Sequence, residues 1–226
     1  MHDAKSTGRI VAALLLTKLV LGPIQNFALM GPVVAAPGFL VNAAAHPLNL
    51  PLAVLIAFAI CIASVAIAAV SWVVFRRAAP ALALAFLAFT VVRVATSLVE
   101  CMTIMSMQSL SQAHAAAPGA DAALYDGLRL VVGKARNWAH YINLMTGGVA
   151  MFTMFLLMYR ARLVPRAICG FGMAAVVTQL YSLGLPFFDG AVDFNLLAPL
   201  GVAYLALCVW LLWRGFSEPE RVRPAV

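Results

Sequence analysis

The chain has 226 residues, of which 64% are hydrophobic and 10% are charged, and its mean hydropathy is +0.98. About 25% of the residues in a typical soluble domain are charged. This chain therefore lacks the polar surface that a soluble enzyme or soluble binding module needs, and its composition indicates an integral membrane protein. No stretch is polar enough to fold outside lipid, so we expect one membrane domain over residues 1–226.

Six apolar stretches reach or approach the roughly 20 residues that an α-helix needs to cross the hydrocarbon core. They are residues 10–30, 52–75, 81–105, 140–159, 167–188 and 196–213. Inside lipid every backbone polar group must be paired within the protein, and at these lengths only helices satisfy that requirement. We therefore predict an all-α integral membrane protein with six transmembrane helices.

The first predicted span could instead be a cleaved signal peptide, because Lys5 and Arg9 precede its apolar run. Lys18 interrupts that run, however, and the run continues past Pro23 to full spanning length. These two features favour a retained helix. Cleavage of the first span stays an open alternative.

The formal net charge is +7, but the positions of the basic residues favour a membrane topology over a nucleic-acid partner. Ten of the fifteen lysines and arginines flank predicted spans on one side: Lys5, Arg9, Arg76, Arg77, Arg160, Arg162, Arg166, Arg214, Arg221 and Arg223. Such an excess marks cytoplasmic loops. We predict a bacterial inner-membrane protein whose N- and C-termini are both cytoplasmic.

Two outer segments differ from ordinary polar loops. Residues 31–50 carry no formal charge, so we expect them to lie on the bilayer surface or to fold back into the protein. After Pro118-Gly119, Asp121 is a predicted N-cap. Apolar residues then recur at helical spacing, opposite Asp126, Arg129 and Lys134: Leu124, Leu128, Val131, Ala135 and Trp138. This pattern predicts an amphipathic interfacial helix between the third and fourth spans.

Ionisable groups inside a span cost about 2.5–3.5 kcal/mol to insert and mark candidate functional sites. Arg93, Ser97 and Glu100 share one face of the third predicted span, at spacings of four and three. Other polar residues lie in the outer halves of the fourth and fifth spans. We predict a ligand-binding cluster open to the outer side: Arg93, Ser97, Glu100, His140, Asn143 and Gln179. Polar side chains also hold helices together, at about 0.6 kcal/mol per hydrogen bond, so a structural role is the competing interpretation.

Metal ligands and cofactor motifs are not evident in the sequence. The four cysteines lie in apolar stretches without metal-ligand spacing: Cys61, Cys101, Cys169 and Cys208. Met102, Met105 and Met107 would suit Cu(I), but no second cluster is placed opposite them. We therefore predict neither a metal nor a cofactor.

Three functional hypotheses follow. The leading one is binding of a small molecule or lipid in a polar cavity, in a transporter-like protein with the bilayer as its main partner. The second is an intramembrane enzyme in which Glu100 and His140 share acid–base chemistry, with its other catalytic residues unassigned. The third is a structural membrane protein. The ligand and the oligomeric state stay open.

Several short motifs accompany the predicted spans. They are Gly8-Arg9, the stretch MSMQSLSQ at 105–112, NWAHY at 137–141, Tyr159-Arg160, LVPR at 163–166 and Gly170. With these motifs, over most of its length, the chain resembles the bacterial multi-pass membrane proteins of the domain of unknown function 4386 family. The resemblance implies a multi-pass architecture and no particular activity.

Overall fold

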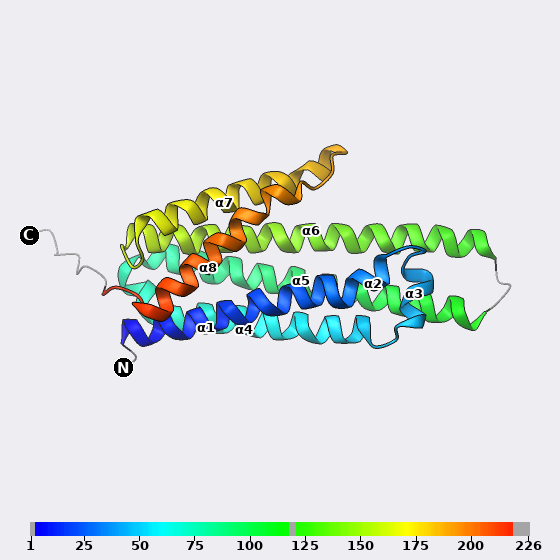
Figure 1. Cartoon of the computed structure of the whole chain (residues 1–226), viewed down its shortest axis with the longest axis horizontal. Coiled ribbons are helices and arrows are strands. Elements are labelled where there is room, and N and C mark those ends of the chain that lie inside the picture. The colour runs from blue at the N-terminus through cyan, green and yellow to red at the C-terminus, as the bar shows by residue number, and fades with distance from the viewer. Residues whose placement is uncertain (1–2, 118–120, 219–226) are drawn as a thin grey trace, which may run out of the picture. The chain divides into compact units, whose positions relative to one another are not determined.

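The structure is a computed structural model of the chain, and it describes residues 3–117 and 121–218. Within those residues, six helices are long and apolar enough to cross a membrane (Figure 1). Their bounds are Ala4–Val34, Asn49–Ala78, Pro80–Ala116, Ala122–Arg160, Arg166–Phe188 and Phe194–Trp213. Each predicted span lies inside one of these helices, so the expected all-α architecture with six candidate spans is confirmed. Pro118, Gly119, Arg221 and Arg223 lie outside the described residues.

The first spanning helix is composite. It consists of α1 (Ala4–Pro23), the π-helix η1 (Ile24–Leu29) and α2 (Met30–Val34). Pro32 has no N–H to donate to the preceding turn, and its ring crowds the carbonyl four residues earlier. The wider π-turns lie just before it, and Asn49 Nδ2 donates to the carbonyl of Leu29 at 3.1 Å. A side-chain amide thus satisfies one carbonyl of the irregular stretch.

Helices α4 (Asn49–Ala78), α5 (Pro80–Ala116) and α6 (Ala122–Arg160) have ends that fit their sequence. Pro80 is the first residue of α5, a position where its missing N–H costs nothing. Arg76 and Arg77 lie in the last turn of α4 and complement its dipole. Asp121 Oδ1 accepts hydrogen bonds from the backbone N–H groups of Ala123 and Leu124, at 3.0 and 3.3 Å. The predicted N-cap is confirmed.

The amphipathic segment predicted between the third and fourth spans is the first part of α6, which continues unbroken to Arg160. The described residues contain no separate interfacial helix between these spans. No proline interrupts residues 122–160, and glycine alone lowers helix propensity without ending the helix. At 1.5 Å per residue, the 37 residues of α5 and the 39 of α6 span about 55 and 58 Å. Both helices are therefore longer than the hydrocarbon core of about 30 Å.

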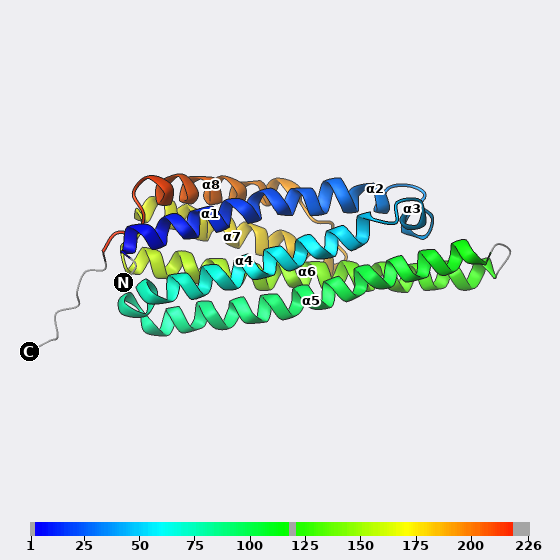
Figure 2. The same cartoon turned by 90° about the horizontal axis from the view of Figure 1, so that it is seen from below.

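The last two spans form a helix pair. Helix α7 (Arg166–Gly184) leads into the 3₁₀ turn η2 (Leu185–Phe188), and η3 (Phe194–Leu196) leads into α8 (Ala198–Trp213). Figures 1 and 2 both place α7 and α8 side by side. Ser182 Oγ donates to the carbonyl of Asp193 and accepts from its N–H, each at 2.9 Å. One hydroxyl thus ties the connection to the end of α7.

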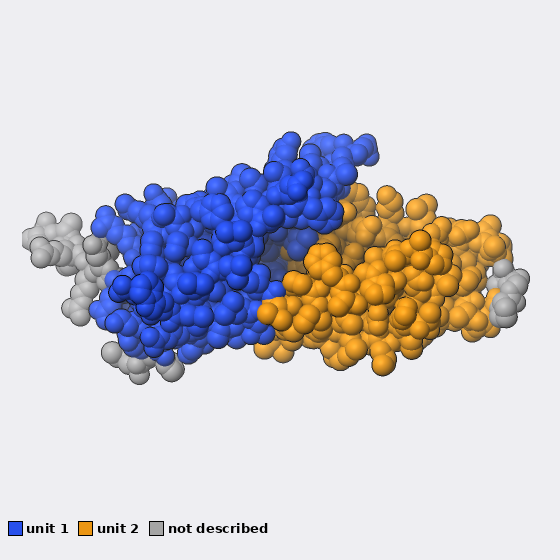
Figure 3. Space-filling view, viewed as in Figure 1, with its two compact units in different colours: residues 1–19, 63–93, 144–226 blue, residues 20–62, 94–143 orange. Residues whose placement is uncertain are grey.

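The chain divides into two compact units, each assembled from segments that are remote in sequence (Figure 3). The first unit comprises residues 1–19, 63–93 and 144–226, and the second comprises residues 20–62 and 94–143. The core of the first unit includes the fully buried Phe75, Phe155 and Phe216. The core of the second is built on Met30, Leu50, Ile104 and Met107. The expectation of a single membrane domain stays a prediction.

Two glycines allow backbones to meet in the first unit. A Cβ added to Gly8 would lie 2.5 Å from the backbone nitrogen of Phe216. Gly215, with φ of +71°, follows α8, and a Cβ there would lie 2.5 Å from Lys5 Cα. Arg9 Nε also donates to the carbonyl of Leu212 at 3.3 Å. The Gly8-Arg9 motif therefore packs the start of α1 against the turn after α8.

The uncharged segment between α2 and α4 folds back into the second unit. Gly38, with φ of +114°, precedes α3 (Phe39–Ala45), whose Phe39 and Ala43 are buried. Ser111 Oγ of α5 donates to the carbonyl of Leu40 at 2.8 Å and accepts from the N–H of Ala44 at 2.9 Å. Residues 31–50 were expected either to lie on the bilayer surface or to fold back into the protein, and the structure shows the second arrangement.

Candidate ligand site around Glu100

Glu100 lies on the face of α5 that points into the second unit. Ile104, Gln108 and Ser111 follow it at spacings of four, four and three and are all buried. The Glu100 side chain is only 4% exposed. A carboxylate in such surroundings is strongly destabilised unless hydrogen-bond donors replace the water it has lost.

Three residues of α6 supply those donors, and their spacings of four and three place them on one face of that helix. His140 Nδ1 lies 2.7 Å from Glu100 Oε1, and Asn143 Nδ2 donates to Glu100 Oε2 at 2.7 Å. Arg136 Nη2 lies 3.6 Å from Glu100 Oε1. Both carboxylate oxygens therefore have partners, and one of those partners carries a positive charge.

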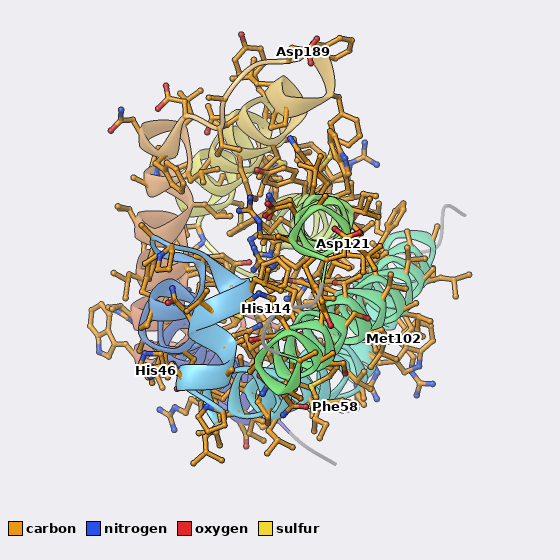
Figure 4. The ribbon with its side chains drawn as sticks, turned by 90° about the vertical axis from the view of Figure 1, so that its right-hand side faces the viewer. His46, Phe58, Met102, His114, Asp121 and Asp189 are labelled. Carbon is orange, nitrogen blue, oxygen red and sulfur yellow. The ribbon has the colours of Figure 1, made fainter. Side chains whose placement is uncertain are left out.

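A second contact fixes α5 and α6 in register further along. The rings of His114 and Tyr125 meet edge to face with centroids 5.0 Å apart, and Figure 4 labels His114 at the end of α5. In Figures 1 and 2, residues 94–116 of α5 run beside residues 122–143 of α6. The donors on α6 are thus held opposite Glu100 by packing as well as by hydrogen bonds.

Comparison with known proteins agrees with the architecture. A family model described as "Domain of unknown function (DUF4386)" matches residues 10–215. The chain belongs to this family. No curated protein and no solved structure matches it. The resemblance inferred from the short motifs is confirmed, and membership of DUF4386 makes the chain a multi-pass membrane protein without supplying an activity.

The imidazole of His140 meets the carboxylate of Glu100 through Nδ1. An ionised carboxylate only accepts hydrogen bonds, so Nδ1 carries the hydrogen that lies between His140 and Glu100. In the neutral ring, Nε2 is then the basic nitrogen. The His140 side chain is 20% exposed, against 4% for Glu100. The geometry pairs a buried carboxylate with a more accessible imidazole.

The six residues predicted for the site fall in both units. Ser97, Glu100, His140 and Asn143 belong to the second unit, and the last three are in contact. Ser97 is buried one turn before Glu100. Arg93 belongs to the first unit, where its Nη1 donates to Ser64 Oγ at 2.6 Å. Gln179 is also in the first unit, so the grouping of all six residues stays a prediction.

One residue of the site, Arg136, was not in the predicted ligand-binding set. Arg136 precedes His140 by four residues, and this spacing alone could have identified it. Gln108 lies outside the cluster, about 12 Å further along the buried face of α5, and both polar atoms of its amide are buried without a hydrogen-bond partner. Arg136 Nε is likewise buried without an acceptor. Buried polar atoms are nearly always paired, so the described side chains leave this network incomplete.

The described residues contain no group of three His, Cys, Asp or Glu side chains placed to hold a metal ion. The methionines near Cys101 do not converge either. Met102, labelled in Figure 4, is 71% exposed, whereas Met107 is 1% exposed. They point in different directions from α5.

Around residues 136–143, helix α6 turns polar side chains inward, whereas Asp126, Arg129 and Lys134 earlier on the helix are exposed. Arg136, His140 and Asn143 face Glu100, whereas Leu124, Leu128 and Val131 are exposed, Val131 by 65%. A soluble protein would bury the apolar side of such a helix. This earlier part of α6 instead leaves both apolar and polar side chains exposed.

Proposed function

We propose that this DUF4386 protein binds a small molecule or a lipid through the cluster around Glu100, in the outer half of the bacterial inner membrane. The observation that carries the proposal is the buried carboxylate of Glu100 with donors from Arg136, His140 and Asn143. Buried ionisable groups in a membrane protein are rare and mark ligand or ion sites by default.

The incomplete network supports ligand binding over a purely structural role. A structural cluster gains stability by pairing every buried polar atom. Here the Nε of Arg136 has no partner among the described residues. A bound polar group would complete the network, because this N–H needs an acceptor.

Helix lengths support a location near the outer surface. Glu100 lies 20 residues after Pro80, and His140 lies 20 residues before Arg160. Both distances are about 30 Å along the helix, the thickness of the hydrocarbon core. If the basic residues at the inner ends mark the cytoplasm, then Glu100 lies at the outer boundary and both termini are cytoplasmic. The first part of α6 would then meet the outer interface with its exposed apolar face.

Ligand co-purification tests the proposal. The wild type, Glu100→Gln and Asn143→Ala would be purified in a mild detergent, and bound molecules would be extracted and identified by mass spectrometry. We expect one enriched molecule in the wild type and much less of it in both variants. Ser106→Ala is the matched control, because the exposed Ser106 hydroxyl bonds only the carbonyl of Met102 in its own helix. Equal retention in all four proteins, or no enriched molecule, would contradict the proposal.

The pair formed by His140 and Glu100 favours acid–base catalysis as the second candidate function. The same extraction separates the two candidates when His140→Gln is added. An enzyme would accumulate unprocessed substrate in this variant, so the extracted molecule would change mass. A binding protein would hold the same molecule in smaller amount. A transporter-like role would in addition require flux of that molecule across proteoliposomes.

A further inference from the structure

A groove of about 300 Å³ lies in the second unit, beside the cluster around Glu100. Its walls come from the segment joining α2 to α3, from α5 and from α6. One side carries three basic residues of α6, Arg129, Lys134 and Arg136. The other side is apolar and includes Phe39 and Met107. A cationic edge above an apolar wall suits an amphiphile with a negatively charged head.

The ion pairs at the groove leave one positive charge in excess. Arg129 pairs with Asp126 at 3.3 Å, and Arg136 lies 3.6 Å from Glu100. Lys134 forms no ion pair with any residue that the structure describes. The groove therefore offers one uncompensated ammonium beside two guanidinium groups, which suits a monoanion such as a phosphodiester.

Glycines keep the groove open. A Cβ added to Gly133, in the middle of the basic segment, would lie 3.6 Å from the ring of Phe39. That distance is an ordinary contact, so alanine fits there, but a longer side chain would occupy the groove. Gly38, with φ of +114°, lets the α2–α3 segment turn beside Arg129.

The depth of the basic residues matches that of lipid headgroups. Arg136 and Lys134 precede Arg160 by 24 and 26 residues, about 36 and 39 Å along α6. A bilayer with its headgroups is about 40–45 Å thick. With Arg160 at the inner surface, both residues reach the outer headgroups.

We propose that this groove binds the phosphate of an anionic phospholipid of the outer leaflet, with Lys134 on the phosphate and the apolar wall of Phe39 and Met107 beside the headgroup. A soluble phosphate ester offers the same headgroup chemistry without the chain. The groove shares Arg136 with the site of the proposed function and the same outer orientation. Lys134 and Gly133 belong to the groove and not to that site, so their variants separate the two inferences.

Native mass spectrometry in detergent, with added lipid, tests the proposal. The wild type should bind phosphatidylglycerol more tightly than phosphatidylcholine. Lys134→Gln should weaken phosphatidylglycerol binding about fivefold, since one basic residue near a membrane contributes about 1 kcal/mol, and should leave phosphatidylcholine unchanged. Gly133→Leu should remove the preference, and Gly133→Ala should keep it. Arg77→Gln, which removes an exposed charge outside the groove, is the control.

Four outcomes would overturn the proposal. The first is equal binding of the two lipids by the wild type. The second is an equal effect of Arg77→Gln and Lys134→Gln. The third is displacement of phosphatidylglycerol by millimolar glycerol 3-phosphate or inorganic phosphate, which would assign the groove to a soluble phosphate. Glu100→Gln should keep the lipid preference even if it loses the molecule that co-purifies with the wild type. A lipid preference that depends on Glu100 and not on Lys134 would also contradict the proposal.

Discussion

At the scale of residues, Glu100 is the point where the second unit departs from an ordinary apolar core. Its charge is buried, and the charged partner that the structure places beside it is Arg136, at 3.6 Å. Breaking a buried pair by neutralising one partner costs more than removing both, because a lone buried charge remains. Because of this asymmetry, single and double variants can measure the interaction between Glu100 and Arg136.

We predict that Glu100→Gln and Arg136→Met each lower the free energy of unfolding by about 3–5 kcal/mol. The double variant should lose less than the sum of the two, by about 0.5–3 kcal/mol, as residues in contact do. Thermal unfolding in detergent of the wild type, both single variants and the double variant measures this coupling. Strictly additive losses would show that the two residues do not interact.

The sequence also predicts a network reaching from Glu100 to Arg93, seven residues earlier on α5, and a parallel cycle with Arg93→Met tests that pair. Arg93 Nη1 donates to Ser64 Oγ at 2.6 Å. We therefore expect Glu100 to couple more strongly to Arg136 than to Arg93. Equal or stronger coupling of Glu100 to Arg93 would contradict this expectation and support the network along α5.

A steric prediction concerns the contact of α7 with α6 in the first unit. A Cβ added to Gly172 would lie 2.5 to 2.7 Å from three ring atoms of Phe155, which is fully buried and cannot yield. Gly172→Ala should destabilise the protein by about 1–3 kcal/mol. Gly170→Ala on the same helix is the control, because nothing lies within 4 Å of its added Cβ. The unfolding temperatures of the two variants should therefore differ, and similar values would contradict the packing.

The sequence predicted Glu100, His140 and Asn143 because ionisable and amide groups stand out against apolar spans. It passed over Arg136, since that residue also fits a polar segment outside the membrane. Gln108 was left out of the predicted site because it, too, lies in a polar segment beyond the predicted end of the third span. Pairing across helices depends on the register of α5 against α6, and periodicity within one helix does not determine that register.

At the scale of elements, hydropathy located the helices and underestimated their lengths. The predicted third span ends at residue 105, where serines and glutamines begin, but α5 continues to Ala116. These residues are compatible with a helix, and their polarity limits only the part that can lie in hydrocarbon. The same distinction explains why the predicted interfacial helix and the fourth span are one helix, α6.

The fold of the segment between α2 and α4 predicts a difference between neighbouring cysteines. Ala43 is fully buried in the second unit, whereas Ala45 is exposed. A cysteine at Ala45 should react with a membrane-impermeant maleimide much faster than one at Ala43. The four native cysteines are buried and should give little background. Equal, fast labelling of both positions would mean that the segment does not pack against the helices.

At the scale of the whole molecule, the direction of insertion follows from charge and not from packing. Basic residues gather at one set of helix ends: Arg76 and Arg77 end α4, Arg160 ends α6, and Arg166 begins α7. The same packed fold could be inserted in either orientation, because the hydrocarbon core is equally apolar when entered from either side of the membrane. The translocation machinery retains basic loops in the cytoplasm, so we predict from the distribution of charge that these helix ends are cytoplasmic.

Reporter fusions test that topology. Fusions after Arg77, Arg166 and Arg223 should report a cytoplasmic location, and fusions after Gly119 and Gly190 should report the periplasm. The order follows from six spanning helices and a cytoplasmic N-terminus, since each crossing reverses the side. The fusion after Gly119 is decisive, because α5 and α6 flank it and both are longer than the hydrocarbon core. A cytoplasmic signal there would mean that the chain does not cross between Arg77 and Gly119. The cluster around Glu100 and the neighbouring groove would then not open to the outer side, and both proposals that place a ligand there would lose their orientation.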